Sequence, residues 1–149
     1  MEEETGVQMY GRFNSQTNED EFFFTELLWE LTESLPTKVF TIQELEFIMD
    51  KERWDDSNGE TEVVVPYTPL QVINNPQAYP SHQQRIANAD LTYPILVVLE
   101  PDLDVLDGVH RLLKQMLSGN TTITGRVIPP EILYQAKVPF SVKYATITN

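Results

Sequence analysis

The sequence has no cysteine and only two histidines among its 149 residues. The absence of cysteine excludes disulfides, thiolate catalysis and metal sites with cysteine ligands. With only His82 and His110 available, a metal site built from several histidines is also excluded. A chain without disulfides is typical of a reducing compartment. We therefore expect an intracellular protein, in the cytoplasm or nucleus, or one packaged in a virion that is assembled inside a cell.

Long hydrophobic runs are also missing. No apolar stretch approaches the roughly 18 residues that a transmembrane helix needs. The N-terminal sequence is acidic and has no apolar core of a secretory signal. We therefore expect neither secretion nor membrane association. The length of 149 residues and the hydrophobic content of 41% are sufficient for one domain with its own core.

Basic residues are scarce in the first part of the chain. Residues 1–62 contain 17 acidic and 4 basic side chains, whereas residues 63–149 contain 6 of each kind. The whole net charge of −13 therefore comes from the first part. An acidic surface repels nucleic acid phosphates, so DNA is disfavoured as a partner. The same surface favours a basic protein partner.

Aromatic and aliphatic side chains are concentrated in residues 19–35. Asn18 and Glu21 resemble a capping box, and a proline follows the segment. Phe22 and Trp29 flank the main apolar stripe, and they either enlarge the core or dock on a protein partner. The spacing of the stripe predicts a helix over 19–35, from Phe23, Phe24, Leu27, Leu28, Leu31 and Leu35.

The rest of the first half contains short patterned segments. Four prolines between residues 66 and 80 predict an irregular excursion without regular structure. Elsewhere we expect strands at 7–13, 38–42 and 62–66, and helices at 43–50 and at 81–89, the last one capped by Ser81.

The second half has clearer patterns. An apolar run predicts a buried strand at 94–99, and alternation predicts a returning strand at 103–107. A complete amphipathic stripe predicts a helix at 109–118 that stops at Gly119 and Asn120. Further expected elements are strands at 122–128 and 138–147 and a short helix at 130–134. Mixed strands and helices indicate the α+β class, with a small mixed sheet and packed helices.

The junction between the strand at 103–107 and the helix at 109–118 carries the most chemistry. A helix N-terminus offers unpaired backbone N–H groups and a partial positive charge, and Gly108 lets a ligand approach the backbone. Arg111 and His110 add donors suited to phosphate oxygens. Asp107 either caps the helix or helps to hold a metal ion that accompanies phosphate. The opposing interpretation is that Asp107 is only a cap and that the other two are surface residues.

This junction carries a resemblance to a known family. The segment "LDVLDGVHRLLKQMLSGNTTITGRVIP" resembles the signature of the ParB/sulfiredoxin superfamily, in which a strand, a glycine loop and a helix that starts with His-Arg hold nucleotide phosphates. "ADLTYPILVV" and "TKVFTIQEL" are similar to two other strands of that family. The resemblance implies a phosphate site at Asp107, Gly108, Val109, His110 and Arg111. It also implies a ParB/sulfiredoxin-like domain over 37–149, preceded by an acidic extension with an aromatic helix over 1–36.

The branches of the superfamily differ in function. Sulfiredoxins place a cysteine directly before the His-Arg pair, where this chain has Val109, so that activity is excluded. Chromosome-partitioning ParB proteins continue into a helix-turn-helix domain. Only 17 residues follow position 132, so we expect no such domain here. ParB-like small-molecule kinases carry Asp-Gly-His-His-Arg, which "DGVHR" resembles except at Val109. Such a kinase also needs an acidic base, for which Glu44 and Glu46 are the candidates.

The resemblance therefore implies a ParB-like protein that binds a nucleotide (CTP, ATP or ADP) with Mg²⁺, with or without weak NTPase activity. Two alternatives stay open at this point. In one, the domain is a non-catalytic interaction or structural component of a larger assembly, such as a viral one, and has no cofactor. In the other, it is a small-molecule kinase.

Overall fold

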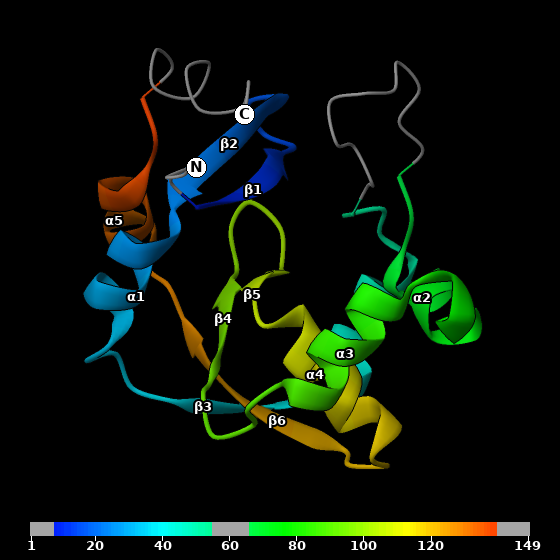
Figure 1. The fold of residues 1–149 in the computed structure, drawn as a ribbon. Coiled ribbons are helices and arrows are strands. Elements are labelled where there is room, and N and C mark those ends of the chain that lie inside the picture. The colour runs from blue at the N-terminus through cyan, green and yellow to red at the C-terminus, as the bar shows by residue number, and fades with distance from the viewer. Residues whose placement is uncertain (1–7, 55–65, 140–149) are drawn as a thin grey trace, which may run out of the picture. The chain divides into compact units, whose positions relative to one another are not determined.

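The computed structural model describes residues 8–54 and 66–139, and its contacts divide the chain into two units (Figure 1). Unit 1 consists of Met1–Lys38, Leu96–Asp107 and Arg126–Asn149. Unit 2 consists of Val39–Ile95 and Gly108–Gly125. The expected strands at 62–66 and 138–147 lie largely outside the described residues. No helix in the described part of the chain is long and apolar enough to cross a membrane.

Strands and helices are mixed along the chain, which confirms the α+β class. The described elements, in chain order, are β1 (Met9–Asn14), β2 (Glu19–Phe24), α1 (Thr25–Thr32), β3 (Lys38–Thr41), the 3₁₀ helix η1 (Gln43–Asp50), α2 (Pro69–Asn74), η2 (Pro76–Ala78), α3 (Pro80–Asn88), β4 (Ile95–Val98), β5 (Asp104–Asp107), α4 (Val109–Leu117), β6 (Thr122–Val127), α5 (Pro130–Leu133) and η3 (Tyr134–Ala136).

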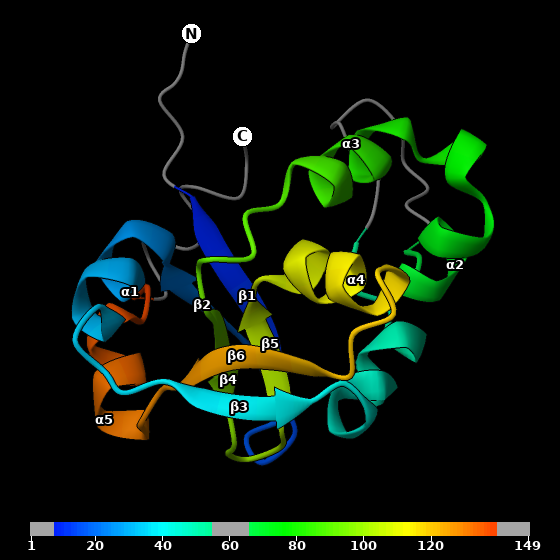
Figure 2. The same cartoon turned by 90° about the horizontal axis from the view of Figure 1, so that it is seen from below.

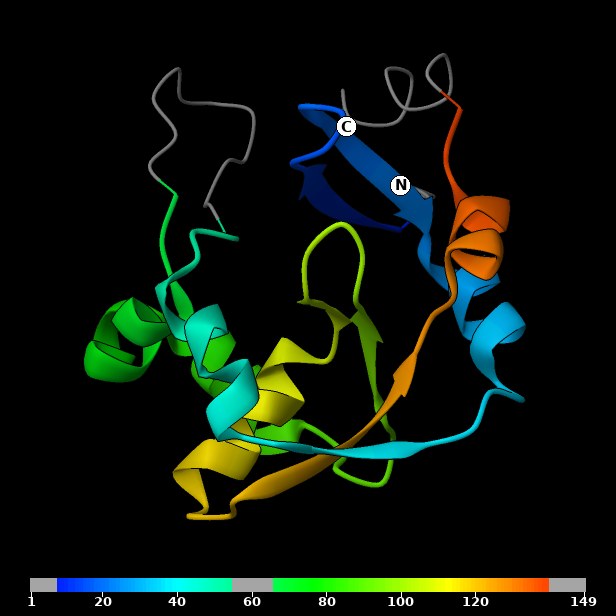
Figure 3. The same ribbon diagram turned by 180° about the vertical axis from the view of Figure 1, so that it is seen from behind.

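The strands form two small sheets. One is the antiparallel hairpin β1-β2, in which Met9 pairs with Phe24 and Asn14 with Glu19. The other has the strand order β3-β6-β4-β5. Within it, β4 and β5 form the antiparallel pair that the sequence predicts, with Val97 opposite Val105 (Figure 3).

The predicted helix over 19–35 is wrong in its first third. Residues 19–24 form β2, and only Thr25–Thr32 is helical. Asn18 does not cap a helix. Its φ of 61° places it in the turn of the hairpin, where the Asn14 side chain accepts hydrogen bonds from two turn N–H groups. Three consecutive phenylalanines fit a strand as well as a helix, and hairpin pairing decides between them.

The core of unit 1 joins segments that are distant in sequence. Phe23 of β2 and Leu28 of α1 are fully buried. They pack in one cluster with Leu96, Val98, Leu106, Ile128, Leu133 and Ala136. The sequence suggested that residues 1–36 form an extension, but the contacts place its described residues, 8–36, in one unit with 96–107 and 126–139.

In unit 2, α4 is the predicted amphipathic helix. Val109, Leu112 and Leu113 are buried, whereas Leu117, at the end of the stripe, is 56% exposed. Gly119 follows the helix with a φ of 80°, as the predicted stop requires. Helix α3 packs against α4 (Figure 2). Lys114 of α4 donates hydrogen bonds to two backbone carbonyls at the end of α3.

The predicted irregular excursion over 66–80 is wrong, because this segment contains α2, η2 and the start of α3. Pro69, Pro76 and Pro80 each stand in the first turn of one of these helices. Proline is favoured there because its missing N–H has no partner at a helix start in any case. The helix predicted at 81–89 is confirmed as α3. The predicted cap at Ser81 is wrong, because Tyr79 is the N-cap and makes no side-chain cap bond.

Candidate functional site

Helix α4 begins at a glycine in the left-handed region. Gly108 is its N-cap, with a φ of 104°. The N-cap position is therefore occupied by Gly108, one residue after Asp107. A side chain at position 108 would also meet a neighbour, because an added Cβ would lie 2.6 Å from Cγ2 of Ile95. Both the left-handed backbone and the close contact with Ile95 therefore favour glycine at position 108.

Arg111 folds back to the start of this helix. Its Nη1 donates a hydrogen bond of 3.1 Å to the carbonyl oxygen of Pro94. Its Nε and Nη2 each lie 3.1 Å from the position that a Cβ on Gly108 would occupy. The guanidinium group is therefore held beside the backbone of the N-cap. A cation at this end of a helix is opposed by the helix dipole, so positive potential is concentrated here.

Asp90 is close enough to Arg111 for its pKa to be affected by this charge. The pKa of Asp90 is lowered chiefly by hydrogen bonds from the side chain and backbone of Thr92, and to a smaller extent by the charges of Arg111 and Lys114. Asp90 is fully exposed to solvent, where water screens such interactions. It therefore offsets only part of the positive potential at the start of α4.

His110 is joined to the other histidine of the chain. Nε2 of His110 lies 2.9 Å from Nδ1 of His82, and Nε2 of His82 lies 2.8 Å from the hydroxyl oxygen of Tyr67. Both distances are those of hydrogen bonds. His82 and Tyr67 are buried, whereas His110 is partly exposed. The three side chains form a continuous hydrogen-bonded chain that ends beside the start of α4.

Aromatic rings pack against these three hydrogen-bonded side chains. Trp54 stacks on His82 with ring centroids 4.2 Å apart and on His110 with centroids 5.0 Å apart. Tyr79 packs on Tyr67 with centroids 4.6 Å apart. Stacking fixes the planes of both imidazoles, so the hydrogen bonds of the pair keep their direction.

The contact between the two histidines limits where their protons can lie. A hydrogen bond between two imidazole nitrogens requires one nitrogen that carries a proton and one that does not. At least one of the two rings is therefore neutral while this bond is formed. The contact between the two histidines was not predicted from the sequence. The only signal was that the chain has just two histidines and that one of them follows the glycine.

The remaining predicted site residues have other surroundings. Val109 is buried, so only its backbone can serve a ligand. Asp107, the last residue of β5, accepts a hydrogen bond of 3.2 Å from the indole N–H of Trp29 within unit 1. Glu44 and Thr41 exchange two hydrogen bonds at the start of η1, which is a capping-box arrangement. Glu46 is exposed on the same 3₁₀ helix.

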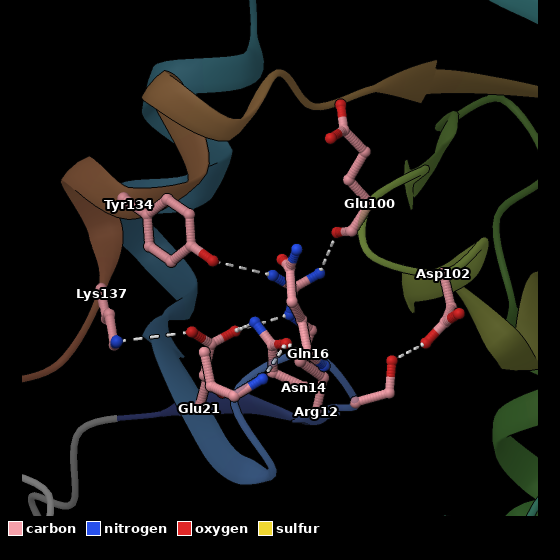
Figure 4. Close-up of polar contacts among 10 residues, drawn as sticks. Arg12, Asn14, Gln16, Glu21, Glu100, Asp102, Tyr134 and Lys137 are labelled. Atoms are coloured by element: carbon pink, nitrogen blue, oxygen red, sulfur yellow. Dashed lines mark hydrogen bonds and ion pairs between the residues drawn. The ribbon is translucent and has the colours of Figure 1, made fainter.

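A second polar cluster, in unit 1, was not predicted from the sequence (Figure 4). Arg12 of β1 and Glu21 of β2 face each other across the hairpin, with 2.9 Å between Nε and Oε1, and both side chains are 4% exposed. Asn14 and Lys137 also donate hydrogen bonds to the Glu21 carboxylate. Burial acts to raise the pKa of Glu21, but the hydrogen bonds from Asn14 and Arg12, the charge of Arg12 and the bond from Lys137 together lower it.

Arg12 makes two further contacts that fix its position. Its Nη1 donates to the carbonyl oxygen of Glu100 at 2.8 Å, and its Nη2 donates to the hydroxyl oxygen of Tyr134 at 3.3 Å. Cross-strand partners on a hairpin are visible in a sequence only when the register is known. Because a helix was predicted over 19–35, the pairing of Arg12 with Glu21 across a hairpin was not predicted.

No group of three or more histidine, cysteine or acidic residues lies together in the described ranges 8–54 and 66–139 in a way that would hold a metal ion. The chain has no match among protein-family models, among curated proteins or among solved structures.

Proposed function

We propose that this chain is a ParB-like domain that binds the phosphate group of a nucleotide at the start of α4. The observation that carries the proposal is the position of Arg111, whose guanidinium lies beside Gly108 at the positive end of the helix. An anion placed there gains from the backbone N–H groups, the helix dipole and charge-assisted hydrogen bonds together.

The histidine pair supports the same function. His110 occupies the first turn of α4, and its ring is held by His82 and by Trp54. A phosphate dianion near His110 would favour the protonated pair, because an imidazolium adds a second charged donor to the site. The site thus combines a fixed cation with a group whose charge can follow that of the ligand.

Calorimetric titration with CTP, ATP and ADP, each with and without Mg²⁺, tests the proposal. Arg111→Ala should weaken binding about 10- to 150-fold, the effect of losing charged hydrogen bonds of about 1.5–3 kcal/mol. His110→Ala should weaken binding less. Arg85→Ala is the matched control, since Arg85 is exposed on α3 of the same unit and its removal changes the net charge equally.

Two results would reject a phosphate site. One is the absence of binding to any of the three nucleotides at millimolar concentration with Mg²⁺ present. The other is an equal loss of affinity in the Arg85 and Arg111 variants, which would indicate only general attraction to positive charge.

A second function, as an interaction component of a larger assembly, is favoured by two exposed aromatic side chains of unit 1. Trp29 is 48% exposed and Phe13 is 58% exposed. Phe22, by contrast, lies across the hairpin, within 3.1 Å of the position of a Cβ on Gly11, so it packs within the unit. Sedimentation tests this function. Self-association of the chain that Trp29→Glu abolishes would favour it over nucleotide binding.

A further inference from the structure

Unit 1 contains a cavity of about 190 Å³ beside Arg12. Residues 98–101 and 127–130 form most of its wall, and three of these are prolines: Pro101, Pro129 and Pro130. Four of the lining residues have polar side chains, namely Arg12, Gln16, Glu100 and Tyr134, and Figure 4 shows how these side chains lie. The other lining side chains are apolar, and we call the part of the cavity beside Arg12 its polar end.

The buried guanidinium of Arg12 has donors to spare. Arginine carries five N–H donors. Three are used, for Glu21, for the carbonyl of Glu100 and for Tyr134. Within residues 8–54 and 66–139, no acceptor contacts the other two, which are on Nη1 and Nη2. Because the three existing bonds hold the group in place, these donors are oriented before any ligand arrives.

Tyr134 adds a donor of its own. Its hydroxyl oxygen accepts the bond from Nη2 of Arg12, so the hydroxyl proton is directed elsewhere. In the part of the chain that the structure describes, no acceptor contacts this proton. The polar end of the cavity therefore offers donors from both Arg12 and Tyr134.

Charged groups of both signs surround this end, because Glu100 also lines the cavity. The hydrogen-bonded groups Arg12, Glu21 and Lys137 together carry one net positive charge. The carboxylate of Glu100 points away from Arg12, which contacts only its backbone carbonyl. A ligand with an acceptor-rich, negatively charged head group would therefore complete the hydrogen bonding of this end.

We propose that this cavity binds a small monocarboxylic acid with a compact apolar body, its carboxylate on Arg12 and Tyr134 and its body against the prolines. The size is suitable, since a cavity of about 150 Å³ with apolar walls is known to accept benzene. An aromatic or alicyclic acid of this size fits the volume. This site is independent of the phosphate site proposed in unit 2.

Benzoate is the probe for a test by two-dimensional NMR with the full ¹⁵N-labelled chain. Saturable shifts are expected at the backbone N–H groups of Leu99, Glu100, Ile128 and Tyr134 and at Nε–H of Arg12, with a Kd of about 1 mM or tighter. Benzamide has the same shape without the charge and should bind at least about 10-fold more weakly, because it loses the charge-assisted bonds. Benzamide binding as tightly as benzoate would overturn the proposal, as would shifts that do not saturate.

Two variants locate the ligand without breaking the buried ion pair. Tyr134→Phe removes one donor and should weaken benzoate binding about 3- to 10-fold, the effect of one ordinary hydrogen bond. Val127→Phe fills the cavity from β6, where an aromatic residue suits a strand, and should abolish binding while the chain stays folded. Unchanged affinity in Val127→Phe would exclude the cavity.

The two proposed sites can be told apart in the same experiment. Arg111→Ala removes the main cation of the phosphate site and should leave the affinity for benzoate unchanged. Tyr134→Phe should leave the affinity for nucleotide unchanged. If benzoate binding is lost in Arg111→Ala, the acid binds at α4 and the inference about Arg12 is wrong, whether or not nucleotides bind.

Discussion

Replacing Gly108 by alanine should destabilise the protein much more than the same change at Gly119. Both glycines have a positive φ, of 104° and 80°, and both adjoin α4. They differ in their surroundings. A Cβ at position 108 would lie 2.6 Å from Cγ2 of Ile95 and 3.1 Å from the guanidinium of Arg111, whereas nothing lies within 4 Å of a Cβ at position 119.

The expected losses of stability follow from the cost of the left-handed backbone and the cost of the contact with Ile95. A left-handed backbone costs an L-residue about 1–2 kcal/mol, and this applies to both variants. The contact with Ile95 adds overpacking of about 1–3 kcal/mol at position 108 only. The gain from restricting the unfolded chain is the same for both changes and cancels in the comparison. Gly108→Ala should therefore cost about 2–5 kcal/mol, and about 1–3 kcal/mol more than Gly119→Ala.

Urea denaturation followed by circular dichroism measures both free energies of unfolding, provided that the slope with urea is the same in the variants. Gly108→Ala should also weaken nucleotide binding, because its Cβ displaces Arg111. Equal losses of stability in the two variants would refute the reasoning, since they would show that residue 108 has free space beside it and that Arg111 does not lie over it.

Three further predictions concern stability. Leu113→Ala should cost about 2–5 kcal/mol by leaving a cavity, whereas Leu117→Ala, at an exposed position on the same helix, should cost below about 1 kcal/mol; urea denaturation measures both. The lowered pKa of Glu21 means that its stabilising contribution is present above the ordinary pKa of 4.5 and is lost as the pH falls through the folded-state value, so urea midpoints should decrease below about pH 4.5, and Glu21→Gln should remove this part of the pH dependence. Tyr67→Phe should cost about 1–3 kcal/mol of unfolding free energy, because it leaves Nε2 of the buried His82 without its hydroxyl partner.

The sequence predicted those elements whose pattern is local and complete. Helix α4 carries its apolar stripe and its glycine stop within a dozen residues, and both are confirmed. Strand β4 is an uninterrupted apolar run, and it is buried along its whole length. In such segments, burial and backbone preference agree, so neighbouring sequence is sufficient.

The wrong secondary-structure predictions lie in segments that suit two structures equally well. In these segments, contacts with distant residues determine which structure forms. Phe22, Phe23 and Phe24 suit a helix or a strand, and β1 selects the strand by pairing with them. The prolines of 66–80 were interpreted as breakers, although a proline in the first turn of a helix favours it. In the candidate site, too, contacts between residues close in sequence were predicted and contacts between distant residues were not. Gly108 and Arg111 are neighbours in sequence and were predicted together, whereas His82 reaches His110 only through the packing of α3 on α4.

The acidic composition does not determine whether anions bind to this chain. Charges separated by more than about 8 Å are largely screened at physiological ionic strength, so the surplus of acidic residues acts mainly on distant approach. At short range, the positions of the hydrogen-bond donors determine whether an anion can bind. Arg12 is held by a carboxylate, a carbonyl and a hydroxyl and keeps two donors oriented, and Arg111 is bonded to the carbonyl of Pro94 at the positive end of a helix. In each place a cation is fixed by its neighbours before a ligand arrives, so an incoming anion does not have to order it.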